Sequence, residues 1–342
     1  MAHSLTELNN KYIIVRYLKI TKMQRTAQQI HNHLQSVNKI TLVSHPNPDG
    51  DTLGAAMAFA EYLRNLKKEV KNFCLSPVPE KFGFLNNIHL VSFDPATFLE
   101  SEVITVLDCG DLRFAGIAEI IKDHPATLVN IDHHATNEKY GHLNMVIPNA
   151  SSTTEVVYNF FKFNNIYITR TMATALLTGL ITDTDNFSNS ATSYTSLTAA
   201  SDLLRLGANW TVIHHSLVQN KSIAILKLWG LILSRLHKKE NSDMAYTYLT
   251  IKDLLQYGIS DEEVEGISNF LNKLDGAKIS LFIKETADGK IKGSFRTTSD
   301  EIDVSALAKK MGGGGHKKAA GFTTDGTIES VVEKIINLQS EK

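Results

Sequence analysis

Short runs of apolar, β-branched residues alternate with longer stretches of helical periodicity along the first part of the chain. Ile40–Val43, Val103–Leu107 and Thr127–Ile131 are typical of strands that are buried in a parallel sheet. The pattern predicts one more strand and five helices around them: Glu69–Leu75, and Thr26–Val37, Leu53–Leu66, Ser151–Phe161, Thr171–Ile181 and Ser196–Leu206. This alternation predicts an α/β domain with a doubly wound, mostly parallel sheet.

The pattern changes in the second part of the chain. As far as about Lys239 it is leucine-rich and predicts helices, which we interpret as a linker between two domains. Beyond it, the sequence predicts a short helix and four strands: Val304–Lys310, and Ala245–Thr250, Ile279–Lys284, Lys290–Arg296 and Ala319–Thr323. We therefore expect an N-terminal extension at 1–23, a first domain at 24–210, a helical linker at 211–240 and a smaller α/β domain at 241–342.

Composition narrows the functional classes. The 342 residues are 43% hydrophobic and 21% charged, with a formal net charge of −1, so no basic field for long nucleic acids is expected. The two cysteines do not suggest a secreted disulfide framework. No apolar run reaches the length of a membrane span, and residues 1–23 lack the features of a signal peptide. We expect a cytoplasmic protein.

Acidic and histidine residues follow the predicted strands and one predicted helix. They are His45, Asp49 and Asp51 in the loop after Ile40–Val43, Asp108, the tripeptide Asp132-His133-His134, and Asp183 after Thr171–Ile181. Each has an ordinary alternative. A lone His45 is more often a loop or core histidine, Asp108 could cap the following segment, Asp183 could be a turn residue, and the tripeptide is a weak signal by itself. The stretch Asn47-Pro48-Asp49-Gly50 by itself fits a turn. Because the carboxyl ends of parallel strands meet at one edge of a sheet, we expect these side chains to converge.

Such a cluster indicates a metal centre. The candidate ligands are His45, Asp49, Asp51, Asp108, His133 and Asp183, with His134 beside them. Oxygen-rich sites with a few imidazoles suit manganese, and magnesium, cobalt or zinc less well. Six ligands indicate two ions bridged by one carboxylate, as in two-metal hydrolases of phosphate esters and anhydrides.

Two further stretches are suited to bind anions. Gly312–His316 reads GGGGH, and four consecutive glycines carry a high entropic cost unless the backbone must approach a ligand such as phosphate closely. A flexible linker is the alternative, which the strand predicted directly afterwards disfavours. The helix predicted at Ser151–Phe161 begins with hydroxyl residues and could present backbone N–H groups to an anion.

In combination, these motifs resemble the DHH phosphoesterase superfamily. Four motifs match its N-terminal domain: HPNPDGD at His45–Asp51, VLDCGD at Val106–Asp111, IDHH at Ile131–His134 and ITDTD at Ile181–Asp185. The stretch GGGGHKKAAG at Gly312–Gly321 is similar to the substrate-binding motif of the associated second domain. The resemblance extends from about Thr26 to Glu333.

The resemblance implies roles for individual residues. It implies one manganese ion on His45, Asp49 and Asp108 and a second on Asp51, Asp108, His133 and Asp183, so that Asp108 is the bridge. His134 would lie beside the reacting phosphate as an acid or electrostatic stabiliser, oriented with His133 by Asp132. A remote phosphate of the substrate would bind Arg296, Gly314, Gly315 and His316. Arg113 is a further candidate, although an ordinary surface arginine is an equally good interpretation.

Within this superfamily, the chain resembles the stand-alone oligoribonucleases in its length and in its GGGGH motif. We therefore expect a manganese-dependent enzyme that hydrolyses short oligoribonucleotides and 3′-phosphoadenosine 5′-phosphate (PAP). The alternative is a phosphodiesterase for cyclic di-AMP or the dinucleotide pApA; a family II pyrophosphatase or a non-catalytic nucleotide sensor fits less well. The sequence does not rank these substrates, and it is compatible with a homodimer.

Overall fold

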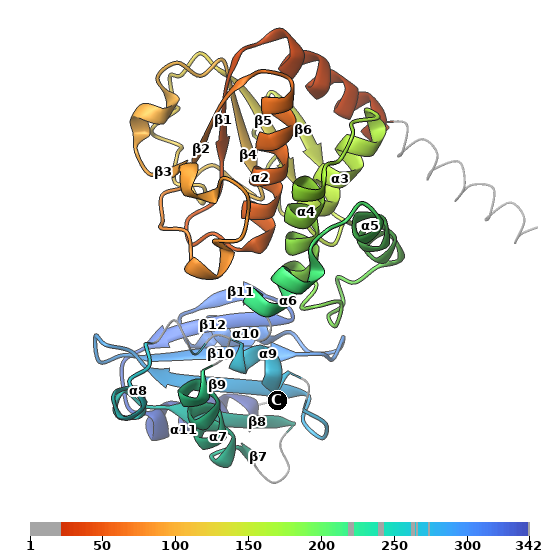
Figure 1. Ribbon diagram of the computed structural model, residues 1–342. Helices are drawn as coiled ribbons and strands as arrows, with labels where there is room; N and C mark the ends of the chain where they lie inside the picture. Colours follow the sequence, from red (N-terminus) through yellow and green to blue (C-terminus); the bar gives the residue numbers. More distant parts are fainter. Residues whose placement is uncertain are drawn as a thin grey trace, which may run out of the picture. The chain divides into compact units, whose positions relative to one another are not determined.

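The computed structural model describes residues 22–217, 222–238, 243–260, 264, 266–272 and 274–340. The predicted N-terminal extension therefore lies almost entirely outside the described residues. The chain divides into two compact units, residues 1–220 and 221–342 (Figure 1). The bounds predicted at residues 210 and 240 stay predictions.

A six-stranded sheet with the order β3-β2-β1-β4-β5-β6 forms the centre of the first unit. Its strands are β1 Lys39–Val43, β2 Glu69–Phe73, β3 Val91–Ser92, β4 Val103–Leu107, β5 Thr127–Asp132 and β6 Leu143–Val146. Every pairing between neighbouring strands of this sheet is parallel. The predicted doubly wound sheet is confirmed.

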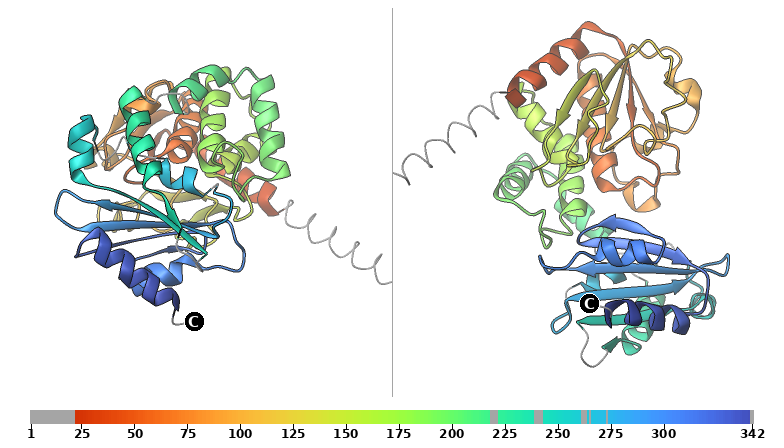
Figure 2. Two further views of the ribbon diagram at one scale, coloured as in Figure 1. Left: turned by 90° about the horizontal axis from the view of Figure 1, so that it is seen from below. Right: turned by 180° about the vertical axis from the view of Figure 1, so that it is seen from behind.

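Helices cover one face of this sheet (Figures 1 and 2). They are the helix at residues 22–36, α2 Gly50–Asn65, α3 Thr153–Phe163 and α4 Arg170–Asp183. Because side chains alternate along a strand, Val103 and Leu107 pack on the helices, whereas Ile104 and Val106 point to the other face. That face is covered by Phe98 of the 3-10 helix η3 (Pro95–Phe98) and by the loop after β4.

Helices α2 and α4 approach each other closely because glycines lie at their contact. A Cβ atom at Gly54 would come within 2.3 Å of the Ala175 carbonyl oxygen. A Cβ atom at Gly179 would lie 2.6 Å from Oδ1 of Asp51. The close packing therefore brings Asp51, in the first turn of α2, directly against α4. Two further helices, α5 Tyr194–Arg205 and α6 Trp210–Leu217, follow α4.

The second unit contains a mixed sheet with the order β11-β12-β10-β9-β8-β7. Its strands are β7 His237–Lys238, β8 Met244–Leu249, β9 Ile279–Glu285, β10 Ile291–Thr297, β11 Gly314–His316 and β12 Ala319–Thr324. The helices are α7 Ile223–Ser234, α8 Ile251–Tyr257, α9 Ile267–Leu271, α10 Val304–Lys310 and α11 Ile328–Ser340. Residues of α10 and α11 form a core on one face of the sheet, and residues of α7 and α9 form a core on the other.

Two stretches of this unit differ from the prediction. The leucine-rich stretch predicted helices as far as about Lys239. This prediction is wrong for His237–Lys238, because these two residues form an edge strand that pairs with β8. The glycine-rich run was open to interpretation as a flexible linker, but Gly314–His316 pair with β12 and form an ordered strand.

In the part of the chain that the structure describes, the helices are all too short or too polar to cross a membrane.

Candidate active site

The predicted metal ligands gather at the carboxyl edge of the first sheet, where the strand order reverses. Strands β1 and β4 are neighbours, and from them the chain continues in opposite directions across the sheet. The loop after β1 carries His45 and Asp49, and Asp108 directly follows β4. Such a reversal is the usual place for a ligand in an α/β sheet.

Asp108 lies between two histidines and turns one carboxylate oxygen toward each. Its Oδ2 atom lies 3.5 Å from Nε2 of His45, and its Oδ1 atom lies 3.6 Å from Nε2 of His133. On the far sides, Asp49 Oδ1 is 3.8 Å from His45 Nε2, and Asp183 Oδ2 is 3.4 Å from His133 Nε2. One carboxylate therefore joins a His45–Asp49 group to a His133–Asp183 group.

The donor atoms of these groups fit divalent cations. His45, Asp49 and Asp108 offer ligand atoms that all lie within 4.8 Å of one another, and so do Asp51, His133 and Asp183. Carboxylate oxygens with one imidazole in each set are ligands that manganese or magnesium accepts. The structure thus brings together all six residues that the sequence predicted as ligands.

The backbone at Asp108 adopts a left-handed conformation, with φ of +62°. This conformation is uncommon for a residue with a side chain, although Asp and Asn adopt it more readily than most. It is held in place because the N–H group of Asp108 donates to the carbonyl of Ile131 in β5, at 3.1 Å. The bend turns the carboxylate out of the strand direction and toward both histidines.

Asp51 is buried and accepts hydrogen bonds from the start of α3. Its Oδ2 atom accepts from the backbone N–H of Thr153 at 2.6 Å, and Oδ1 accepts from the N–H and hydroxyl of Thr154 at 2.9 and 2.8 Å. The Thr153 hydroxyl donates to Asp108 Oδ1 at 2.9 Å. The anion at this helix terminus is therefore a carboxylate of the chain, and both threonines were missing from the predicted site.

His134 is oriented by a buried carboxylate. Its Nδ1 atom lies 2.8 Å from Oδ1 of Asp132, which also accepts the backbone N–H of His133 at 2.8 Å. The second oxygen of Asp132 accepts from Asn137 Nδ2 at 2.5 Å, a contact that the sequence did not predict. Since Nδ1 donates to Asp132, Nε2 of His134 is left for another partner. The hydrogen bond to Asp132 raises the pKa of His134 to about 9.

The crowded carboxylates favour the binding of protons or cations at this centre. Burial, followed by repulsion from Asp108 and Asp49, raises the pKa of Asp183 to about 8. Burial and the same kind of repulsion also raise the pKa of Asp51 well above its ordinary value. Burial acts to lower the pKa of His45, but its contacts with Asp108 and Asp49 outweigh this effect and raise the pKa to about 11. Bound protons or bound cations both relieve the repulsion.

Arg113 lies outside this cluster of ligand atoms. Its side chain is 78% exposed, with Nε 3.7 Å from Asp111 Oδ1 and a guanidinium nitrogen 3.6 Å from Glu138 Oε1. A role for Arg113 in substrate binding stays a prediction.

In the second unit, Arg296 and His316 lie on the same face of the sheet. Arg296 of β10 and His316 of β11 are both directly opposite Ala319, which lies in the strand between them. Directly opposed residues point to the same side of a sheet. The two side chains therefore flank a surface on which Ala319 has only a methyl group.

The fold itself requires three of the four consecutive glycines. Gly312 has a φ of +80°, a Cβ atom at Gly313 would lie 2.1 Å from the Gly321 carbonyl oxygen, and one at Gly315 would lie 2.6 Å from Cα of Ala320. At Gly314, by contrast, no atom lies within 4 Å of the Cβ position. The Cβ position of Gly312 is equally open, so the backbone is accessible to a ligand at Gly312 and Gly314.

Comparison with known proteins identifies two domains. The model of the DHH family N-terminal domain matches residues 39–180, and the model of the DHHA1 domain matches residues 241–341. The first range contains five of the six candidate ligands and ends shortly before Asp183. The second contains Arg296 and the run of glycines.

Similar proteins match almost the whole chain. The bifunctional oligoribonuclease and PAP phosphatase NrnA of Thermus thermophilus is 27% identical over 309 residues, which cover 89% of this chain and 90% of that protein. The cyclic-di-AMP phosphodiesterase PdeA of Listeria monocytogenes is 24% identical over 334 residues, 91% of this chain and 49% of that protein. A crystal structure of an exopolyphosphatase-related protein from Bacteroides fragilis has a TM-score of 0.87 at 24% identity, covering 92% of this chain and 95% of that one, which supports the fold.

Proposed function

We propose that this chain, which belongs to the DHH family and is a metal-dependent phosphoesterase, hydrolyses short oligoribonucleotides and PAP. The observation that carries the proposal is the position of Asp108, with one carboxylate oxygen toward His45 and the other toward His133. This arrangement suits chemistry at a phosphate group with two cations. The oligoribonuclease and PAP phosphatase from Thermus thermophilus, similar over nearly the whole chain, supports the substrate class.

In this proposal, His45, Asp49 and Asp108 hold one manganese ion, and Asp51, Asp108, His133 and Asp183 hold the other. Magnesium or cobalt would suit the same oxygen-rich ligands. When bound, such ions lower the pKa of an attacking water and offset the negative charge that develops on the phosphate. The contacts from Thr153 and Thr154 fix the carboxylates of Asp108 and Asp51 in the positions that this requires.

His134 is the proposed general acid. Its Nδ1 atom is held by Asp132, and its raised pKa of about 9 keeps the imidazole protonated at neutral pH. The proton on Nε2 is then available for the oxygen that leaves the phosphorus, or for a hydrogen bond to the phosphate. Asp132 holds the ring in the orientation needed and stabilises its positive charge.

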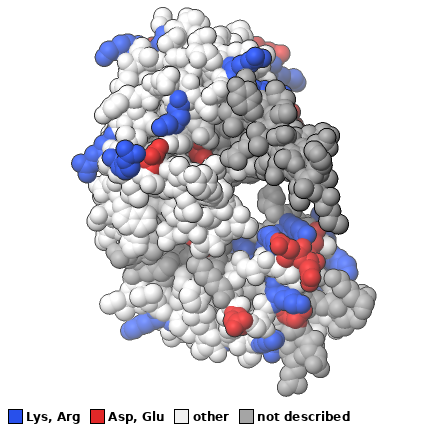
Figure 3. Space-filling view, turned by 90° about the vertical axis from the view of Figure 1, so that its right-hand side faces the viewer, with Lys and Arg blue, Asp and Glu red and all other residues white. Residues whose placement is uncertain are grey.

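The second unit is proposed to bind a phosphate that does not react. Arg296 and His316 flank the small side chain of Ala319, and the open backbone at Gly314, with Gly315 beside it, allows close approach of an anion. Arg113 is a further candidate for the same task. On the face drawn in Figure 3, lysine and arginine side chains of the described residues lie in small separate groups without a continuous basic band. Together with the formal net charge of −1, the absence of such a band on this face supports short substrates over long ones.

A cyclic di-AMP or pApA phosphodiesterase is the second candidate. The likeness to PdeA favours it, although this chain spans only 49% of that protein. A pyrophosphatase is less favoured because the GGGGH run marks the second unit. A non-catalytic sensor is less favoured because all six candidate ligands are present. A cytoplasmic location and a homodimer stay predictions.

A substrate panel tests the proposal. The substrates are pApA, cyclic di-AMP, PAP, inorganic pyrophosphate and RNAs of about 5 and about 20 nucleotides, each with manganese. We expect turnover of PAP, pApA and the shorter RNA, with a steep fall for the longer RNA because a formal net charge of −1 provides no general basic field for it. Equal efficiency on both RNAs, or a clear preference for pyrophosphate, would contradict the proposal. A preference for cyclic di-AMP would select the second candidate.

A further inference from the structure

We propose that Phe114 stacks against a nucleobase of the substrate, an inference that rests on the proposed function. Phe114 lies in the loop after β4, close to the candidate metal centre. The centroid of its ring is 5.6 Å from that of His45, and the two rings are inclined by 39°. Even so, Phe114 is 58% exposed. An open aromatic ring therefore adjoins a candidate metal ligand.

The loop holds Phe114 outward in a defined position. Oδ1 of Asp111 accepts the backbone N–H groups of Arg113 at 2.7 Å and of Phe114 at 2.9 Å, as in a side-chain-capped turn. The next residues, Ala115 and Ile117, are completely buried in the core under this face of the sheet. Phe114 is thus exposed although the backbone on both sides of it is anchored.

Other apolar groups lie beside this loop. Leu75 is 42% exposed, and a Cβ atom at Gly116 would lie 2.1 Å from Leu75 Cδ1 and 3.6 Å from Pro46 Cγ. Leu75 and Pro46 therefore pack on the same loop that presents Phe114. His45 therefore lies between the carboxylate-rich cluster on one side and the apolar groups of Phe114, Leu75 and Pro46 on the other.

A nucleotide has the two parts that such a surface would bind. Its phosphate would be held by the cations that the carboxylate-rich cluster is proposed to bind. The flat face of its base suits an exposed aromatic ring, which accepts any base because all bases have a π face. Inorganic phosphates would gain nothing from Phe114. From the usual strength of base stacking, we expect loss of the ring to weaken the use of a nucleotide substrate by roughly tenfold or more.

A purely structural role is the alternative, in which Phe114 only supports the ring of His45. Three variants separate the two roles: Phe114→Ala removes the ring, Phe114→Leu keeps apolar contact with His45 without stacking, and Phe114→Trp keeps an aromatic surface. Tyr167→Ala is the matched control, because Tyr167 is 80% exposed and precedes α4 at the end opposite Asp183.

The experiment measures kcat/KM with manganese on pApA and on an analogue of pApA that lacks both bases. We expect Phe114→Ala and Phe114→Leu to lose roughly tenfold or more on pApA and little on the analogue, with Phe114→Trp and Tyr167→Ala close to the wild type. Calorimetric manganese binding should be unchanged in all four variants. An equal loss on both substrates, no loss on pApA, or weakened manganese binding in Phe114→Leu would overturn the stacking role. If the wild type itself fails to hydrolyse pApA, PAP and short RNA, the proposed function fails, which is a separate outcome.

Discussion

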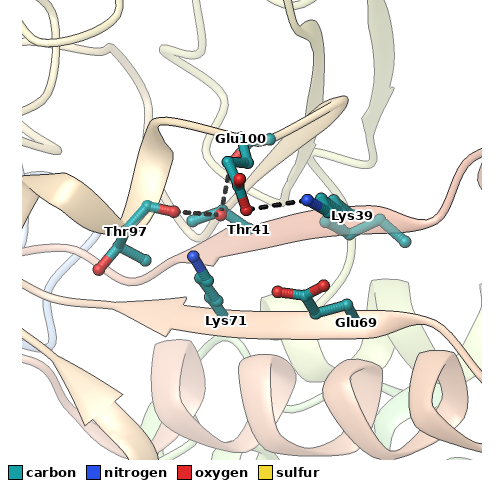
Figure 4. Close-up of a pocket in the computed structure, with 8 residues that line it drawn as sticks. Lys39, Thr41, Glu69, Lys71, Thr97 and Glu100 are labelled. Atoms are coloured by element: carbon teal, nitrogen blue, oxygen red, sulfur yellow. Dashed lines mark hydrogen bonds and ion pairs between the residues drawn. The ribbon is translucent and has the colours of Figure 1, made fainter.

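The charged groups at the two ends of strand β1 are arranged differently. At the amino end, Lys39 Nζ lies 2.8 Å from Glu100 Oε2, and the two line a small pocket with Thr41, Glu69 and Lys71 (Figure 4). Glu102 accepts the backbone N–H groups of Asn38 and Lys39 at 2.7 and 2.8 Å. Here Glu100 has a cation and Glu102 has N–H donors as partners, and the hydrogen bond from Lys39 lowers the pKa of Glu100.

At the carboxyl end, the carboxylates face one another and two histidines. The pKa values of Asp51 and Asp183 are raised there, because both groups are buried beside other carboxylates. The comparison shows that the number of charges in a region does not reveal its role. Solvated charges that are paired contribute little to stability and have no excess charge that would attract an ion. Buried carboxylates without enough neighbouring cations favour the binding of a metal ion.

The strongest way to break this comparison is to remove the shared carboxylate. Asp108→Asn removes the charge and keeps a side chain that tolerates the left-handed backbone. We expect a loss of activity of about a thousandfold or more, because activation of water and charge stabilisation fail together. The measurement is turnover of pApA at saturating manganese. Glu100→Gln is the control at the amino end and should leave turnover unchanged; an Asp108→Asn variant with a tenth of wild-type turnover would contradict the account.

A variant in the second unit sharpens the comparison by leaving both ends of β1 intact. A charge-assisted contact from Arg296 to a phosphate predicts about a ten- to hundredfold loss of kcat/KM on pApA for Arg296→Ala. Manganese binding should not change, because every candidate ligand lies in the first unit. Kinetics and calorimetry on the same preparation check both points. Weaker manganese binding in Arg296→Ala would argue against this division of roles.

A smaller effect is expected from the groups that hold the carboxylates. Thr153→Val removes the hydroxyl that donates to Asp108 and keeps the backbone N–H that donates to Asp51. We expect manganese to bind about tenfold more weakly, which calorimetry would measure. Thr178→Val is the control, since its hydroxyl donates only to Thr174 within α4, at 2.8 Å. Equal manganese affinity in Thr153→Val and the wild type would show that the hydroxyl does not support the site.

The smallest expected effect is on stability as pH changes. Without cations, the folded state holds a proton on Asp183 up to about pH 8, whereas the unfolded state releases it near 3.8. Raising the pH through this range therefore lowers the free energy of unfolding, and the raised pKa of His45 acts in the same direction. We expect Tm of the metal-free protein to fall between about pH 6 and about pH 8, and manganese to stabilise it more at the higher pH. Thermal unfolding that is equally stabilised by manganese at both pH values would be evidence against this.

Part of the fold could be predicted because buried parallel strands read as continuous apolar runs. Strand Val103–Leu107 has the predicted bounds, and so does the helix Val304–Lys310, which was predicted from its helical periodicity. Strands β6 and β11 were not predicted, since four and three residues, with polar or glycine positions among them, give no local signal. Strand β11 exists because it pairs with β12, which is a tertiary property.

The candidate site was predictable for a related reason. Residues at the carboxyl ends of parallel strands share one edge of the sheet, so a cluster that includes Asp108 was expected from where the predicted strands end. The left-handed backbone of Asp108 and the contact between Thr154 and Asp51 could not be predicted from the sequence. These residues are far apart in the sequence, and only the packing of α2, α3 and α4 brings them together.

The central claim is that the carboxyl end of the first sheet binds two cations that share Asp108. Calorimetric titration of manganese into the wild type and Asp108→Asn tests it most directly. The account predicts two ions bound per chain in the wild type, and loss of at least one of them in Asp108→Asn. A single ion per chain in the wild type, or two undisturbed sites in Asp108→Asn, would contradict it.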